Sequence, residues 1–248
     1  MLELSTSQQS IIGVLRNSLK LFKKTWLRLL PLAILMIMSM LMLHTFLPTP
    51  AKLSVQMKHI LNKHLLVIAV LDVIAFWSFL VMFYRSYRIM IAADNGYRAA
   101  IAHVLRKIIP CLFAFFLYCI IVSLGVVCFV VPGIFLAWLL VFSVLAILID
   151  DFGMFASFQY SAKLVWGNWW RTLVVLLGFC VVGFLFITVV VFAVDLFLVF
   201  LLHMSVAHAV VIMNVLAALL VSFLWILLTN VFVCQYYDLK LRYQLKAR

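Results

Sequence analysis

Six long apolar runs constrain this chain more than any other feature. They cover approximately residues 26–47, 65–83, 108–131, 134–149, 172–200 and 209–233. A helix needs about 20 apolar residues to cross roughly 30 Å of hydrocarbon, and it satisfies its own backbone hydrogen bonds there. The runs leave little of the 248 residues beyond short connections and tails. We therefore expect an all-α polytopic membrane protein of six transmembrane helices, with residues 1–248 forming a single membrane domain.

The basic residues indicate how these helices are oriented. All but three of the 19 Lys and Arg residues flank the runs on one side, and the exceptions lie between the first two runs. Positive residues favour the cytoplasm, so we expect both termini there. The net charge of +12 is spread over four juxtamembrane segments. That distribution predicts membrane lipids as partners, and it argues against nucleic acid.

A weak internal repeat divides the chain into three units. Each unit consists of an amphipathic cytoplasmic surface helix, a span, a turn and a second span. The first and third units share five residues at identical spacing, and Asp94, Gly96 and Ala99 of the second match Asp151, Gly153 and Ala156. We expect three parallel helix-hairpin repeats near 10–64, 65–149 and 150–234. The five shared residues are Ser18, Lys20, Leu21, Trp26 and Arg28, which recur as Ser161, Lys163, Leu164, Trp169 and Arg171.

Pro132 and Gly133 punctuate the stretch of 42 apolar or small residues from Ile108 to Ile149. Proline cannot continue a helix, and glycine permits a tight reversal. We expect these residues to form the turn of a hairpin. Because the fourth run is short, this hairpin either spans the membrane or enters it only part of the way.

Two carboxylates interrupt the spans, Asp72 in the second and Asp195 in the fifth. An ionisable side chain in a span costs about 2.5–3.5 kcal/mol at the centre of the membrane, so it marks a candidate site. Both are expected in the outer half of the membrane. One hypothesis is a proton or cation site, or a polar cavity open to the outer face. The alternative is that each carboxylate is hydrated near the interface or bonds to a neighbouring helix.

On the opposite side, Lys163, Asn168, Trp169 and Arg171 end a surface helix and begin a span. Basic and aromatic residues at this depth can hold a lipid headgroup. They can equally serve as interface anchors.

Motifs of catalysis and metal binding are missing. There is no G-x-S-x-G, H-E-x-x-H or P-loop pattern, and the five cysteines have no C-x-x-C spacing. No two histidines show the i,i+4 spacing that puts two ligands on one helical face. We expect no metal site, no cofactor and no enzymatic activity. The histidines expected on the outer side are His44, His59, His64, His203 and His208.

One stretch of about 45 residues contains Val131-Pro132-Gly133-Ile134, Asp150, Gly153 to Ser157, Lys163 to Trp166 and Asn168. In these positions the chain resembles the YciC family of bacterial inner-membrane proteins. More loosely, the chain resembles the membrane domain that precedes some glycerophosphodiester phosphodiesterases. The resemblance implies the bacterial inner membrane and a six-span fold, and it makes a lipid-related role plausible. Members usually carry Arg in place of Lys163 and often Pro in place of Val144; the first departure weakens bidentate phosphate binding.

Three functional hypotheses follow. The first is a non-enzymatic protein of envelope maintenance that binds or moves a lipid or another amphiphile between its repeats. The second is a scaffold that docks a protein partner in the membrane. The third and weakest is an intramembrane enzyme built on Asp72 and a histidine. The ligand, the protein partner and the oligomeric state stay open.

Overall fold

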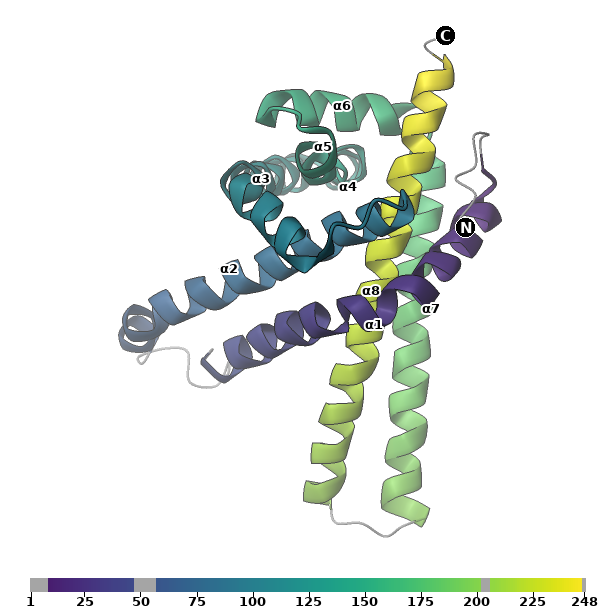
Figure 1. Cartoon of the computed structure of the whole chain (residues 1–248). Coiled ribbons are helices and arrows are strands. Elements are labelled where there is room, and N and C mark those ends of the chain that lie inside the picture. The colour runs from purple at the N-terminus through teal and green to yellow at the C-terminus, as the bar shows by residue number, and fades with distance from the viewer. Residues whose placement is uncertain (1–8, 47–56, 202–205, 247–248) are drawn as a thin grey trace.

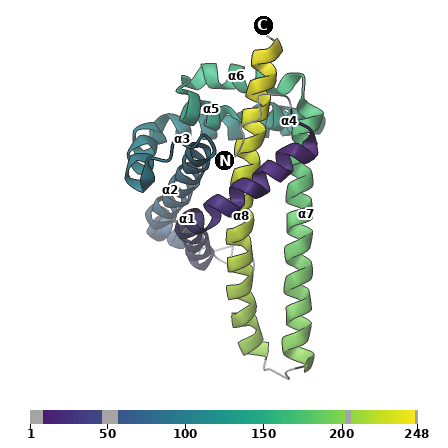
Figure 2. The ribbon, with the colours of Figure 1, turned by 45° about the vertical axis from the view of Figure 1, so that its right-hand side comes forward.

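Three helical hairpins meet at one end of the molecule and point away from it in different directions (Figures 1 and 2). A computed structural model describes the backbone of residues 9–46, 57–201 and 206–246, and the side chains of 9–39, 66–199 and 212–246. We call the end where the hairpins meet the junction, and the opposite ends of the hairpins the loop ends. The hairpins are α1 (Ile11–Phe46) with α2 (Met57–Met90), α3 (Gly96–Cys128) with α4 (Val130–Leu139), and α7 (Trp169–Leu196) with α8 (Val206–Lys246).

Shorter elements complete the chain. Helices α5 (Ser143–Asp150) and α6 (Met154–Trp166) connect the second hairpin to the third at the junction, and a π-helical turn (Phe197–Leu201) extends α7. Helix α8 packs against α1, α2, α6 and α7, so it contacts helices from most of the chain. Its buried aromatic face joins Phe142 to Phe232 and Tyr236, with ring centroids 6.0 and 5.6 Å apart.

The expectation of an all-helical membrane protein is confirmed for the described residues, where every regular element is a helix. Five segments are long and apolar enough to cross a membrane. The first apolar run forms the second half of α1, but part of it lies outside the described side chains. Six spans and three repeats therefore remain predictions. The five segments are Leu66–Met90, Gly96–Cys128, Val130–Asp150, Trp169–Val199 and Ile212–Lys246.

The surface helices differ among the three units. In α1 and α3 the amphipathic segment runs into the span as one continuous helix, through Pro31 and Pro110. Only in the third unit is it separate, because α6 ends at Trp166 and α7 begins at Trp169.

The turn between α3 and α4 lies earlier than Pro132 and Gly133. Helix α3 ends at Cys128, Phe129 is extended, and both predicted turn residues lie in the first turn of α4. Proline is tolerated there because the first N–H groups of a helix have no intrahelical partner. Gly133 instead allows close packing, since a Cβ atom at this position would lie 2.3 Å from the backbone nitrogen of Val126.

The fourth apolar run is not one helix. Residues 140–142 separate α4 from α5, and Ser161 of α6 satisfies the backbone groups that the break releases. Its hydroxyl donates to the Leu139 carbonyl at 2.9 Å and accepts from the Phe142 N–H at 3.2 Å. The buried hydroxyl thus fixes the bend.

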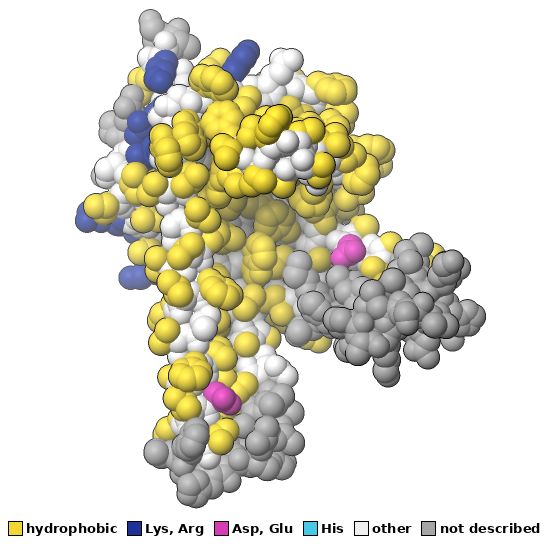
Figure 3. Space-filling model, turned by 180° about the vertical axis from the view of Figure 1, so that it is seen from behind, with side chains coloured by type: hydrophobic (Ala, Val, Ile, Leu, Met, Phe, Trp, Pro, Cys, Tyr) yellow, Lys and Arg dark blue, Asp and Glu magenta, His cyan; other side chains and the backbone are white. Residues whose placement is uncertain are grey.

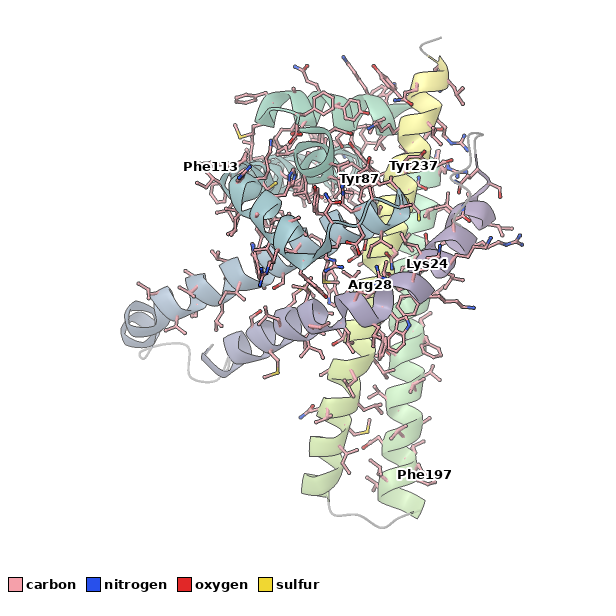
Figure 4. All side chains as sticks on the ribbon, viewed as in Figure 1. Lys24, Arg28, Tyr87, Phe113, Phe197 and Tyr237 are labelled. Atoms are coloured by element: carbon pink, nitrogen blue, oxygen red, sulfur yellow. The ribbon has the colours of Figure 1, made fainter. Side chains whose placement is uncertain are left out.

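Charge and apolar surface are segregated along the hairpins. On the face drawn in Figure 3, Lys and Arg lie toward the junction, and acidic side chains lie on separate arms. Apolar side chains cover the periphery, as Phe113 on α3 and Phe197 after α7 show (Figure 4). This is the surface that a surrounding bilayer requires.

Candidate functional site

Asp72 lines a groove between four helices, α1, α2, α3 and α8. Asp72, Phe76 and Phe79 follow one another at four- and three-residue spacing, which places them on one face of α2. Phe115 of α3 and Trp225 of α8 close the groove from the other sides, and its volume is about 490 Å³.

The aromatic rings of this groove contact one another across helices. The ring centroids of Phe76 and Phe115 lie 5.2 Å apart, and those of Phe79 and Trp225 lie 5.9 Å apart at a nearly perpendicular angle. The Asp72 carboxylate is exposed and has no hydrogen bond or ion pair with any residue the structure describes. The site combines a carboxylate that pairs with no described residue and a wall of aromatic rings.

A second groove lies between α1 and α8. Its volume is about 620 Å³, and its lining includes Met38, Asn214 and Ser222. Trp225 borders both grooves, so they flank the same stretch of α8. Volumes of about 300–1,000 Å³ with mostly apolar linings are typical of small-ligand sites.

The structure does not bring Asp195 to this site. Asp195 lies in the last turn of α7, whereas Asp72 lies on α2. The two hairpins diverge toward their loop ends (Figure 1). The carboxylates therefore do not form one shared site, and the role of each stays a prediction.

The residues predicted to bind a lipid headgroup lie in two different environments, some exposed and one largely buried. Lys163 is exposed on α6, and Asn168 precedes α7. Trp169 stacks on Trp170 at 4.0 Å and meets the edge of Phe135 at 5.4 Å. Lys163 and this aromatic group remain available for a lipid headgroup.

Arg171 is engaged inside the protein. Its Nη2 lies 3.0 Å from the Oδ2 atom of Asp238, whose side chain is completely buried. Asp238 also accepts from Arg242 at 2.8 Å and from the backbone N–H of Gln9 at 2.9 Å. This carboxylate ties α7, α8 and the N-terminal segment together, and sequence reasoning did not single it out.

At the junction an ion pair, which we call a clasp, bridges the first and second, the third and fourth, and the fifth and sixth apolar runs. The base lies near the start of the first run of each pair, and the acid follows the end of the second run. In the first two units, two aliphatic residues and a proline follow the base. This shared pattern supports the predicted repeats, although it does not confirm them. The clasps are Arg28–Asp94 (2.9 Å), Lys107–Asp151 (2.7 Å) and Arg171–Asp238 (3.0 Å).

Other polar contacts join the helices at the junction. Asn230 donates to the Thr25 hydroxyl at 2.9 Å, which joins α8 to α1. Asp150 accepts from the Tyr236 hydroxyl at 2.5 Å and forms an ion pair with Lys240. Burial, together with the negative charge of Asp150, raises the pKa of Tyr160 to about 12. A hydrogen bond from Lys107 lowers the pKa of Asp151 from its usual value.

The structure tests few of the histidine and metal expectations. The side chains of His44, His59, His64, His203 and His208 lie outside the described residues. His103 is described, and its Nε2 lies 3.0 Å from the Leu148 carbonyl oxygen. Among the described residues, no three His, Cys, Asp or Glu side chains gather as a metal site would require.

Comparisons with known proteins add no identity. No family model matches the chain, and neither a curated protein nor a solved structure matches it. The resemblance to the YciC family therefore remains a prediction that rests on the residues quoted above.

Proposed function

We propose that this chain is a non-enzymatic protein of the bacterial inner membrane that binds or moves a lipid or another amphiphile in envelope maintenance. The observation that carries the proposal is the pair of apolar grooves on either side of Trp225, with volumes of about 620 and 490 Å³. Both lie between helices of different hairpins, where an acyl chain from the bilayer could enter.

The polar ends of the molecule suit an amphiphile as well. Lys163, Trp166 and Trp170 are exposed toward the junction, where a lipid phosphate would meet a cation and interfacial aromatic rings. In this proposal both termini and the junction are cytoplasmic. The grooves then lie within the bilayer.

Filling the larger groove tests the proposal. Ala218 lines it, so Ala218→Phe would occupy the space that a ligand needs. We expect native mass spectrometry of lipid-extracted protein to show a stoichiometric amphiphile on the wild type and its loss from this variant.

Ala193→Phe is the matched control, because Ala193 is exposed on α7 and lines neither groove. It should retain the amphiphile at the wild-type level. Identical adducts on all three proteins, or none on any, would contradict the proposal and favour a membrane scaffold.

A further inference from the structure

The groove beside Asp72 carries a single sign of charge. Among the residues whose side chains the structure describes, the lining consists of Asp72 and eight uncharged residues, without Lys, Arg or His. The lining residues are Met36, Asp72, Val73, Ala75, Phe76, Phe79, Leu112, Phe115 and Trp225. From these described residues, a phosphate or another anion would meet the repulsion of Asp72 and no compensating base.

The aromatic residues favour the opposite charge. The faces of aromatic rings are electronegative and attract ammonium groups, most strongly at tryptophan. Phe76 and Phe79 of α2, Phe115 of α3 and Trp225 of α8 all border the groove. Aromatic rings that surround an ammonium group are a recurrent means of binding quaternary ammonium ligands.

The burial pattern suits a ligand with an apolar tail. Ala75 is buried and Phe115 is 43% exposed, so the groove runs from the packed interior of the helices to their outer surface. A charged head at Asp72 could be neutralised while its alkyl chain lies along Val73 and Leu112. A small hydrophilic cation would leave most of this apolar lining without an apolar ligand group to contact.

From charge, rings and shape together, we propose that this groove binds a single-chain amphiphile with an ammonium head, taken up from the bilayer. The inference rests on the proposed amphiphile-binding function and specifies its ligand class. Asp72 pairs with the head, the aromatic rings surround it, and the alkyl tail follows the apolar wall. A zwitterionic lipid fits less well, because none of the described lining residues carries a positive charge to pair with its phosphate.

The test uses the full-length protein in nanodiscs with radiolabelled dodecyltrimethylammonium as the probe. Dodecanol, which has the same chain and no charge, is the comparison ligand. We expect the wild type to bind the cation, and Asp72→Asn to weaken that binding about tenfold or more, since each tenfold step in Kd needs only a modest loss of interaction energy. Dodecanol binding should be the same for both proteins.

Two variants keep the result interpretable. Asp195→Asn removes a carboxylate that lies outside the groove and should leave the affinity unchanged. Asp72→Glu keeps the charge and should restore most of the binding, which a merely misfolded protein could not do.

Equal binding of cation and alcohol, or unchanged cation binding in Asp72→Asn, would overturn this inference. The same holds if phosphatidylethanolamine displaced the probe as well as unlabelled cation did. In each case an amphiphile retained in native mass spectrometry and lost in Ala218→Phe would leave the proposed function intact. If the wild type and Ala218→Phe carried the same adducts in native mass spectrometry, the proposed function itself would be contradicted.

Discussion

Asp238 shows how one residue can hold the junction together. Its carboxylate is completely buried and faces two guanidinium groups, from Arg171 and Arg242, as well as a backbone N–H. Removing one partner of a buried ion pair costs about 3–5 kcal/mol, because the remaining charges lose their compensation. We expect Asp238→Ala to lower the unfolding free energy in detergent by an amount of this order.

Asp195→Ala provides the comparison, because the described residues give Asp195 no ion pair or hydrogen bond. Its stability should change by less than about 0.5 kcal/mol. Equal losses in the two variants would show that the contacts of Asp238 do not stabilise the fold.

Asp151 gives a pH-dependent prediction. The hydrogen bond from Lys107 lowers its pKa, so the folded state favours the carboxylate. The resulting stabilisation is present above the unfolded pKa of about 3.9 and disappears as the pH falls through the folded value. It should be small, because the Asp151 side chain is 63% exposed.

The direct test is a titration of carboxyl-labelled aspartate by NMR. Lys107→Met should raise the pKa of Asp151 toward its usual value. The neighbouring Arg106→Met should leave it unchanged, because Arg106 is not among the groups that shift this pKa. An unmoved pKa in Lys107→Met would exclude the clasp as its cause.

At the level of elements, the α3–α4 hairpin depends on a glycine contact. A Cβ at Gly133 would lie 2.3 Å from the Val126 nitrogen, a backbone atom that cannot rotate away. Gly133→Ala must therefore push the helices apart. We expect it to cost about 1–3 kcal/mol, the usual penalty for overpacking, measured as a lower Tm in detergent.

Gly178→Ala is the matched change in α7, because nothing lies within 4 Å of the added methyl group. Alanine is the better helix former, so this variant should be as stable as the wild type or more so. If both variants behaved alike, close packing at Gly133 would not determine the stability of the hairpin.

The apolar runs predicted where helices lie, but they did not predict how those helices begin, end or bend. Helix α8 continues past its apolar run to Lys246, because residues such as Tyr236 and Asp238 find partners at the junction. The break at residues 140–142 depends on Ser161, which is distant in sequence. Such features arise from tertiary contacts that hydropathy does not record.

The candidate site was predicted only in part. Asp72 stood out because a carboxylate is rare in an apolar run, whereas its aromatic neighbours Phe115 and Trp225 come from other helices. The clasps were missed, although an acid at or after the end of each second span was a visible signal. Arg171 was read as a surface group because nothing local to it reveals Asp238.

For the whole molecule, orientation is the property that ties the grooves to the proposed function. The described Lys and Arg residues avoid the middle of α7 and α8, and they occur at the ends that meet at the junction. Because positive residues stay in the cytoplasm, we expect the junction and both termini to be cytoplasmic. An even number of spans must then connect the termini.

Cysteine labelling in intact cells measures this orientation. The five native cysteines are replaced by alanine, and single cysteines are placed at the exposed positions Ser10 and Gln244 or at Ala51 between the first two apolar runs. A membrane-impermeant maleimide should label Ala51→Cys in intact cells, but Ser10→Cys and Gln244→Cys only after lysis. Labelling of just one terminus from outside would require an odd number of spans, so that the apolar run from 134 to 149 or the first run would not cross. One of the three hairpins would then contain a single span. The three hairpins would no longer share the orientation that their clasps imply, with both ends on the cytoplasmic side.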